Sequence, residues 1–188
     1  MLGADHPNTL TSVGNLGLLL HAQGKLEEAE VLSRRALEGY ERVLGADHPS
    51  TLTSVNNLGL LLQAQGKLEE AEVLYRRALE GKERVLGADH PDTLTSVNNL
   101  GSLLKDLNKL DEAEIMLRRN LEGSEKIFGA GHHDTVNARG NLGLLLMKRG
   151  DESGKGMARD VLSSLLSPPH SLTETHPWIK KFSQALEL

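Results

Sequence analysis

Histidine recurs at a fixed place along this chain, and its ring nitrogens make it the first candidate for chemistry. His6, His48, His90 and His132 stand 42 residues apart. A tetrahedral zinc ion needs all of its ligands at about 2 Å, whereas residues on successive packed helices are separated by roughly 10 Å. The spacing therefore favours a structural role in which each histidine caps a helix, with weak metal binding by the adjacent His132 and His133 as the alternative.

Two other segments resemble reactive sites only in part. Residues 150–156 contain Gly-Lys, but they lack the spacing of a phosphate-binding loop and the Ser or Thr that follows its lysine. Glu69, Glu70 and Glu72 gather as acidic residues do in the first turns of a solvated helix. No nucleophile stands beside a base, and the chain has no cysteine. We therefore predict a protein that is not an enzyme, with no catalytic residue, metal or cofactor.

Asparagine is the other recurring residue type, and it offers binding chemistry. Asn15, Asn57, Asn99 and Asn141 are again 42 residues apart. A carboxamide both donates and accepts hydrogen bonds, so a row of them can pair with the backbone of an extended peptide. The same side chains could instead cap neighbouring helices or solvate the surface. We favour the peptide-binding interpretation, and the second one stays open.

A repeated structural unit must position these residues. The segment Leu-Gly-Ala-Asp-His-Pro begins at residues 2, 44 and 86, and an altered copy begins at residue 128. A fixed period of this size indicates stacked units that share one continuous core. We therefore predict a single solenoid domain over 1–188, built from repeats at about 2–43, 44–85, 86–127 and 128–169.

Each repeat is expected to hold two helices. In the second repeat we place the first helix at about 49–65 and the second at about 68–85, because Pro49 suits a first helical turn and Gly66 suits a tight turn. A glycine in mid-helix costs about 1 kcal/mol relative to alanine, yet one recurs at Gly59 and its equivalents. This recurrence indicates a close helix crossing.

We expect two alanines, Ala71 and Ala78, to be the small residues that face Gly59 across this crossing. A side chain at position 59 would then collide with the second helix.

A stripe of short, uncharged polar residues runs beside this apolar face of the first helix. A solvated face usually carries Glu and Lys, so the composition indicates a binding groove. Repeats one and two differ at five positions, and two of these, Gly14/Asn56 and His21/Gln63, fall on the stripe. The predicted groove residues are Thr11, Asn15, Thr53, Asn56, Asn57, Leu60, Gln63, Thr95, Asn98, Asn99, Ser102, Lys105 and Asn141.

The order and spacing of these residues resemble the tetratricopeptide repeat. That pattern is matched by Asn57-Leu58-Gly59, Leu62, Ala71, Tyr75 and Ala78. The 42-residue period and the Leu-Gly-Ala-Asp-His-Pro link are similar to the long repeats of kinesin light chains. The resemblance implies an all-α, right-handed superhelix of antiparallel helix pairs, an α-solenoid. It also implies that the asparagine of each repeat lines a groove and contacts ligands.

The end of the last repeat departs from this pattern. Pro168-Pro169 ends its second helix early, and Trp178, Phe182 and Leu186 recur every four residues. This spacing predicts a capping helix at about 175–188 with one apolar face, which a solenoid needs to cover its last core layer. The first repeat carries no equivalent cap.

Composition limits the classes of partner. The net charge of −5 provides no basic field for nucleic acid or anionic lipid. No apolar run approaches the roughly 20 residues of a membrane span, and no signal-peptide pattern follows Met1. We therefore expect a soluble, cytoplasmic protein that contacts neither nucleic acid nor membrane.

The favoured function is that of a non-catalytic adaptor, which binds a peptide segment of a partner protein in its concave groove. The alternative is a structural spacer without a groove ligand, which self-associates through its uncapped N-terminal repeat.

Overall fold

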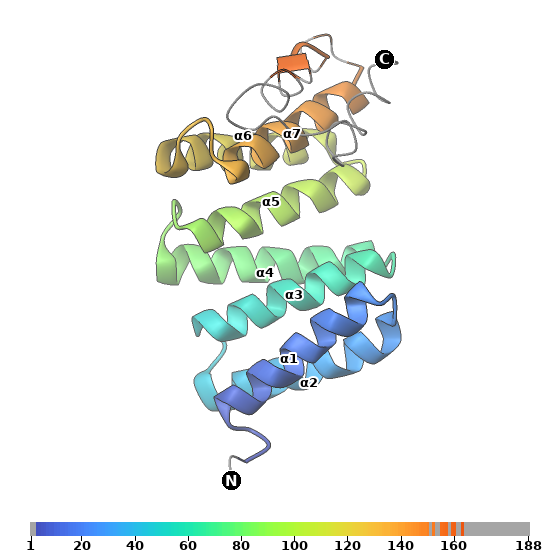
Figure 1. The fold of residues 1–188 in the computed structure, drawn as a ribbon, viewed down its shortest axis with the longest axis vertical. Coiled ribbons are helices and arrows are strands. Elements are labelled where there is room, and N and C mark those ends of the chain that lie inside the picture. The colour runs from blue at the N-terminus through green and yellow to red at the C-terminus, as the bar shows by residue number, and fades with distance from the viewer. Residues whose placement is uncertain (1–2, 151, 153–154, 158, 161–162, 164–188) are drawn as a thin grey trace. The chain divides into compact units, whose positions relative to one another are not determined.

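The computed structural model describes residues 3–150, 152, 155–157, 159–160 and 163 (Figure 1). Every element assigned in these residues is an α-helix, as predicted. The predicted helices at 49–65 and 68–85 start at the expected residues and end within one residue of the expected positions. In order the helices are α1 (Pro7–Ala22), α2 (Leu26–Leu44), α3 (Pro49–Ala64), α4 (Leu68–Leu86), α5 (Pro91–Asp106), α6 (Leu110–Phe128) and α7 (His133–Lys148).

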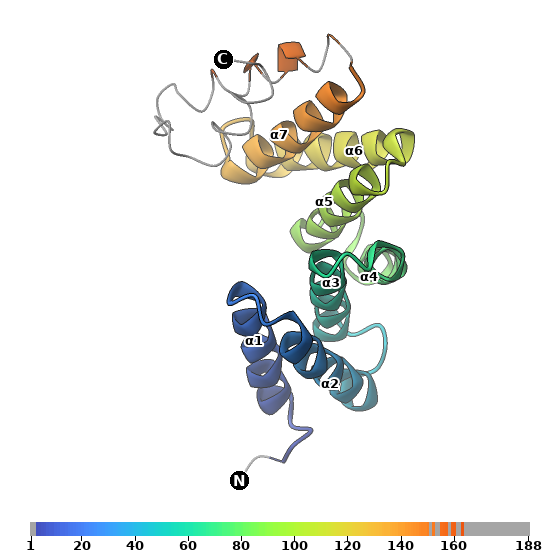
Figure 2. The same ribbon diagram turned by 90° about the vertical axis from the view of Figure 1, so that its right-hand side faces the viewer.

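The chain divides into two compact units, Met1–Leu103 and Leu104–Leu188. In the first unit α1 packs on α2, α2 on α3, and α3 on α4. Figure 2 shows α1 and α3 on the same side of their partners α2 and α4. In the second unit α6 packs on α7. Helix pairs of the predicted kind therefore build each unit, while the single domain over 1–188 stays a prediction.

The recurring histidines cap the first helix of each repeat, as predicted. Nδ1 of His48 accepts a hydrogen bond from the backbone N–H of Ser50 at 3.1 Å, and Pro49 occupies the first helical position. A cap of this kind satisfies one of the N–H groups that a helix start leaves unpaired. The same bond, at 3.1 to 3.3 Å, is made at α1, α5 and α7 by His6, His90 and His132.

Residues with positive φ close the turns between the helices. Gly66, at φ 78°, joins α3 to α4, and Gly45, at φ 90°, follows α2. In the third repeat Asn108 takes the position of Gly66 at φ 61°. Asparagine enters the left-handed region at lower cost than most residues, so this turn keeps its geometry when its glycine is replaced.

Gly59 lies at a close helix crossing, as predicted, but the predicted partners are wrong. A Cβ atom at Gly59 would lie 2.8 Å from Cε1 of Tyr75, and the nearest atoms are not those of Ala71 or Ala78. Tyr75 is fully buried, and its hydroxyl donates to Oε1 of Gln63 at 3.1 Å. The absence of a side chain at position 59 therefore makes room for an aromatic ring rather than for two facing small residues.

Glu30 joins the first repeat to the second. Its carboxylate lies 2.9 Å from Nζ of Lys67 and 2.8 Å from the guanidinium of Arg34. The hydrogen bond from Lys67 is the main cause that lowers the pKa of Glu30 to about 2, with help from Arg34 and Gln65 and against the opposing effect of burial. The ionised carboxylate therefore connects α2 to the turn that precedes α4.

Two apolar residues of α1 lie open to solvent where their equivalents are buried. Leu16 and Leu19 are 47% and 54% exposed, whereas Leu58 and Leu61, at the same places in α3, are 1% and 2% exposed. In the second repeat, α3 packs both on its partner α4 and on α2 of the preceding repeat. The first repeat therefore presents on α1 an apolar face whose equivalent on α3 is covered.

The predicted capping helix at about 175–188, with Trp178, Phe182 and Leu186, lies outside the described residues, as does the break at Pro168-Pro169. In the described part of the chain, no helix combines the length and the apolar character needed to cross a membrane.

Candidate functional site

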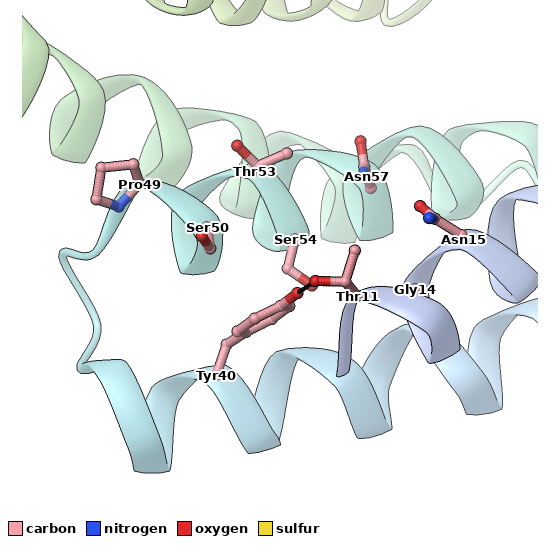
Figure 3. Close-up of a pocket in the computed structure, with 9 residues that line it drawn as sticks. All are labelled: Thr11, Gly14, Asn15, Tyr40, Pro49, Ser50, Thr53, Ser54 and Asn57. Atoms are coloured by element: carbon pink, nitrogen blue, oxygen red, sulfur yellow. Dashed lines mark hydrogen bonds between the residues drawn. The ribbon is translucent and has the colours of Figure 1, made fainter. Parts of the chain in front are cut away.

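A pocket of about 310 Å³ opens in the first unit among residues of α1, α2 and α3 (Figure 3). Four of the predicted groove residues, two on α1 and two on α3, line it. The structure therefore gathers part of the predicted site around one hollow. The lining residues are Thr11, Gly14, Asn15, Tyr40, Pro49, Ser50, Thr53, Ser54 and Asn57.

Tyr40 contributes the aromatic part of this pocket. Figure 3 shows its ring extending from α2 to meet Thr11, and its hydroxyl lies 2.7 Å from Oγ1 of Thr11. The tyrosine is buried in a small core cluster with Leu10 and Ala36. The ring of Tyr40 therefore forms one wall of the pocket. At the edge of this wall, the hydroxyl groups of Tyr40 and Thr11 are hydrogen-bonded to each other.

Polar groups of α3 form another side of the pocket. Ser54 and Asn57 stand one helical turn apart and both line it. Among the residues that the structure describes, neither the Ser54 hydroxyl nor the Asn57 side chain has a hydrogen-bond partner. None of the nine lining residues is charged. The pocket therefore offers neutral hydrogen-bonding groups that remain available to a ligand.

Asn56 lies elsewhere than predicted. Its side chain is 6% exposed, and its Oδ1 accepts hydrogen bonds from Oγ of Ser96 and Nδ2 of Asn99, each at 3.3 Å. This carboxamide joins α3 to α5 and does not face a groove, which corrects its assignment as a groove residue. Successive helical residues point about 100° apart, so of the neighbours Asn56 and Asn57 only one reaches the open side.

The other predicted groove residues of the first unit differ in their exposure and in their hydrogen bonds. Leu60 is 38% exposed, while Gln63 accepts a hydrogen bond from a buried tyrosine hydroxyl at 3.1 Å. Thr95 is exposed and bonds its hydroxyl to the carbonyl one turn earlier at 3.1 Å. Asn98 and Ser102 are partly exposed. None of these five residues lines the pocket.

Lys105 and Asn141 belong to the second unit. There the carbonyl of Lys105 accepts a hydrogen bond from Nζ of Lys148 at 2.7 Å, and Asn141 on α7 is partly exposed. Their place in a groove shared with the first unit stays a prediction.

The pocket also contains residues that the sequence analysis did not place in the groove. Five lining residues are not among the predicted groove residues, namely Gly14, Tyr40, Pro49, Ser50 and Ser54. A signal was present in the sequence, because two of the five differences between repeats one and two, Gly14/Asn56 and Tyr40/Lys82, fall at residues of repeat one that line the pocket. Gly14 and Tyr40 are 26 residues apart in the sequence, so the pattern within one helix did not show that both line one pocket.

We call the pocket, with Gly14, Tyr40, Ser54 and Asn57, the first junction. The equivalent place one repeat later, with Asn56, Lys82, Ser96 and Asn99, is the second junction.

Lys82 gives the second junction a different character. The side chain is 3% exposed, and its Nζ donates to the backbone carbonyl of Asp92 at 3.2 Å. Burial lowers the pKa of Lys82, and the nearby carboxylate of Asp92 opposes this effect in part. A buried amine therefore occupies the place that Tyr40 holds in the first junction.

One possible group of metal ligands lies in the second unit. Ligand atoms of His132, His133 and Asp134 all lie within 4.8 Å of one another. However, Nδ1 of His132 accepts the backbone N–H of Asp134 as the cap of α7, and its ring stacks on Phe128 at a centroid distance of 4.6 Å. A metal ion on that nitrogen would have to displace the cap.

Comparison with known proteins identifies the family to which these repeats belong. The sequence pattern described as Tetratricopeptide repeat matches residues 8–84 and 54–122. No protein with a curated description matches the chain.

Three solved structures are similar over nearly the whole chain. The nearly identical TPR-like repeats of a protein assigned as a kinesin light chain in Podosopora anserina superpose with a TM-score of 0.80, at 22% identity, over 96% of this chain and 85% of that one. A single-residue variant of the same repeats superposes with a TM-score of 0.81, at 21% identity, over 99% of this chain and 86% of that one. BtubC (BKLC) from P. vanneervenii superposes with a TM-score of 0.79, at 22% identity, over 96% of this chain and 71% of that one. These likenesses confirm the predicted α-solenoid fold.

Proposed function

We propose that this chain, which belongs to the tetratricopeptide repeat family, binds a peptide segment of a partner protein through its first unit. Repeats of this family are in general non-catalytic protein-interaction modules. The observation that carries the proposal is the uncharged pocket of about 310 Å³, where predicted groove residues of two successive repeats meet. Binding there would let the chain act as an adaptor.

Asn15 and Asn57 supply the groups that pair with a peptide backbone in this proposal. Each contributes one carboxamide, from α1 and from α3, and Figure 3 places both away from the ring of Tyr40. A carboxamide can accept from a peptide N–H and donate to a peptide carbonyl. Because the lining is uncharged and a flexible peptide loses entropy on binding, we expect affinities of roughly 1 μM, about −8 kcal/mol, with weak salt dependence.

The test is a peptide-array screen followed by calorimetric titration of a selected peptide. Replacing Asn15 and Asn57 together by alanine should weaken binding by about 1–3 kcal/mol through lost hydrogen bonds, while the helical circular-dichroism signal stays unchanged. Val73→Ala is the matched control, since Val73 is 68% exposed on α4 and outside the pocket. Equal affinity of the parent and the double variant would contradict the proposal.

A second candidate function is self-association as a spacer, and the exposed face of α1 favours it. Leu16 and Leu19 are 47% and 54% exposed at positions that are buried in the next repeat. A second copy could cover them and remove about 25 cal/mol of unfavourable free energy per Å² of apolar surface. Light scattering across a hundredfold concentration range would detect it. This function would be favoured if the molar mass of the parent rises with concentration, the mass of the double variant Leu16→Gln/Leu19→Gln does not, and the parent binds no peptide.

A further inference from the structure

The second junction contains a bound carboxamide that the protein supplies itself. The Asn56 side chain extends from α3 and its oxygen accepts from the Ser96 hydroxyl and the Asn99 amide, each at 3.3 Å. With only 6% of Asn56 exposed, this carboxamide fills the space between α3 and α5. The pair formed by Ser96 and Asn99 is therefore a carboxamide-binding pair in this fold.

The first junction presents the same pair without the carboxamide. Ser54 and Asn57 stand one repeat before Ser96 and Asn99, and Gly14 stands one repeat before Asn56. A Cβ atom added to Gly14 would have as its nearest neighbour the Cβ of Ala36, at 3.9 Å. The space that a side chain fills in the second junction is thus part of the open pocket in the first.

We propose that the first junction binds a carboxamide side chain, that of Gln or Asn, from the partner peptide. This inference rests on the proposed peptide-binding function. The ligand's amide oxygen accepts from the Ser54 hydroxyl and the Asn57 amide, as the oxygen of Asn56 does one repeat later. Its NH₂ group donates toward the hydroxyl pair of Tyr40 and Thr11, whose oxygens lie 2.7 Å apart and keep free lone pairs.

The lining selects a carboxamide against other side chains. None of the nine lining residues is charged, so a carboxylate or an ammonium group would lose hydration without gaining an ion partner. An apolar side chain would cover Ser54 and Asn57 and leave their polar groups unpaired. A pocket of about 310 Å³ also admits a side chain together with part of its backbone.

The decisive test uses propionamide, which has the side-chain group of glutamine, in an NMR titration of the whole chain. Propionamide should shift the backbone signals of Ser54 and Asn57 and the side-chain NH₂ signal of Asn57, whereas propionate should bind about fivefold more weakly or not at all. In Gly14→Asn the protein's own carboxamide should occupy the site and abolish these shifts. The variant should fold, because the nearest atom to a Cβ there is at an ordinary contact distance of 3.9 Å.

Gly14→Ala is the matched control, since it adds the Cβ without the carboxamide and should keep the propionamide shifts. If propionamide leaves the Ser54 and Asn57 signals unchanged in the parent, or shifts them equally in Gly14→Asn, the inference is overturned.

A peptide arm separates this inference from the proposed function. Array peptides that differ only in one Gln, Asn, Glu or Met should bind the parent with about a fivefold preference for Gln or Asn, and Gly14→Asn should lose that preference. Peptides that bind without preference would overturn the inference and leave the proposed function standing. If propionamide binds but no peptide does, the proposed function fails, and with it the peptide as the source of the carboxamide.

Discussion

The first and second junctions are built from nearly the same sequence, yet one is open and the other is filled. Their lining positions differ at Gly14/Asn56, at Tyr40/Lys82 and at Ser50/Asp92. In the second junction a buried carboxamide and a buried amine bond to α5. The first keeps a pocket of about 310 Å³. Changes at three positions therefore separate a packed contact from an open pocket in this solenoid, while the helices that form the two junctions keep the same length.

The difference between the junctions also concerns charge. Tyr40 ends in a neutral hydroxyl bonded to Thr11 at 2.7 Å, whereas Lys82 places an amine where only 3% of the residue is exposed. Burying an amine is costly unless it finds partners, and the carbonyl of Asp92 is its hydrogen-bond acceptor. The first junction thus joins its helices without a buried amine among its lining residues, and its polar groups remain available.

The largest expected effect concerns the crossing of α3 and α4, where Gly59 lies against Tyr75. In Gly59→Ala the new Cβ would lie 2.8 Å from the ring of Tyr75, which is fully buried and fixed. We expect a loss of about 2–3 kcal/mol of unfolding free energy, as for other overpacked sites. In Gly17→Ala the close atom is the Ser33 hydroxyl oxygen, also at 2.8 Å, which can rotate away. Urea denaturation of both variants measures the difference, and equal losses would contradict it.

The second prediction converts the closed junction into an open one. Asn56→Gly should lower the unfolding free energy by about 1–2 kcal/mol, because Asn99 loses its carboxamide partner and glycine weakens the helix. The variant should also gain a pocket like that of the first junction, seen as new propionamide-induced shifts at Ser96 and Asn99. Unchanged stability in urea would mean that the two 3.3 Å hydrogen bonds of Asn56 contribute nothing.

The sequence predicted the repeat architecture because its signals are local and recur from one repeat to the next. The 42-residue period, the histidine caps and the glycine turns each depend on a few neighbouring residues. The partner of Gly59 could not be predicted in the same way, since Tyr75 follows 16 residues later and repeat one has Ser33 at its place.

The candidate site was predicted only in part for a related physical reason. Spacing along one helix located the polar stripe, but whether a stripe residue is open or buried depends on the next repeat. Asn56 and Asn57 have identical side chains, yet Asn56 is 6% exposed and bonds to Ser96 and Asn99 of α5. Tyr40 reaches the pocket from α2, and periodicity on α1 and α3 carries no information about it.

The third prediction tests the link between the two repeats that form the first junction. Glu30→Gln should cost about 1 kcal/mol at pH 7, a value reduced for solvent screening of Lys67 and Arg34. The pKa of Glu30 is lowered from 4.5 to about 2 in the folded chain, so its stabilisation is present above pH 4.5. It should disappear as the pH falls from 4.5 to 2. Thermal unfolding of parent and variant from pH 7 to pH 2 measures this, with Glu27→Gln as the exposed control.

The smallest expected effect is the alkaline pH dependence of the second junction. Burial lowers the pKa of Lys82 below its ordinary value of 10.5, so in the window just under pH 10.5 the unfolded chain binds more protons than the folded one. Stability contributed by this residue therefore rises with pH across that window. Lys82→Met should remove the rise, whereas exposed Lys25→Met should keep it. Urea unfolding at pH 7 to 10.5 measures the difference. If parent and Lys82→Met have parallel profiles, the amine of Lys82 is as hydrated as an exposed one, and the two junctions do not differ by a buried amine.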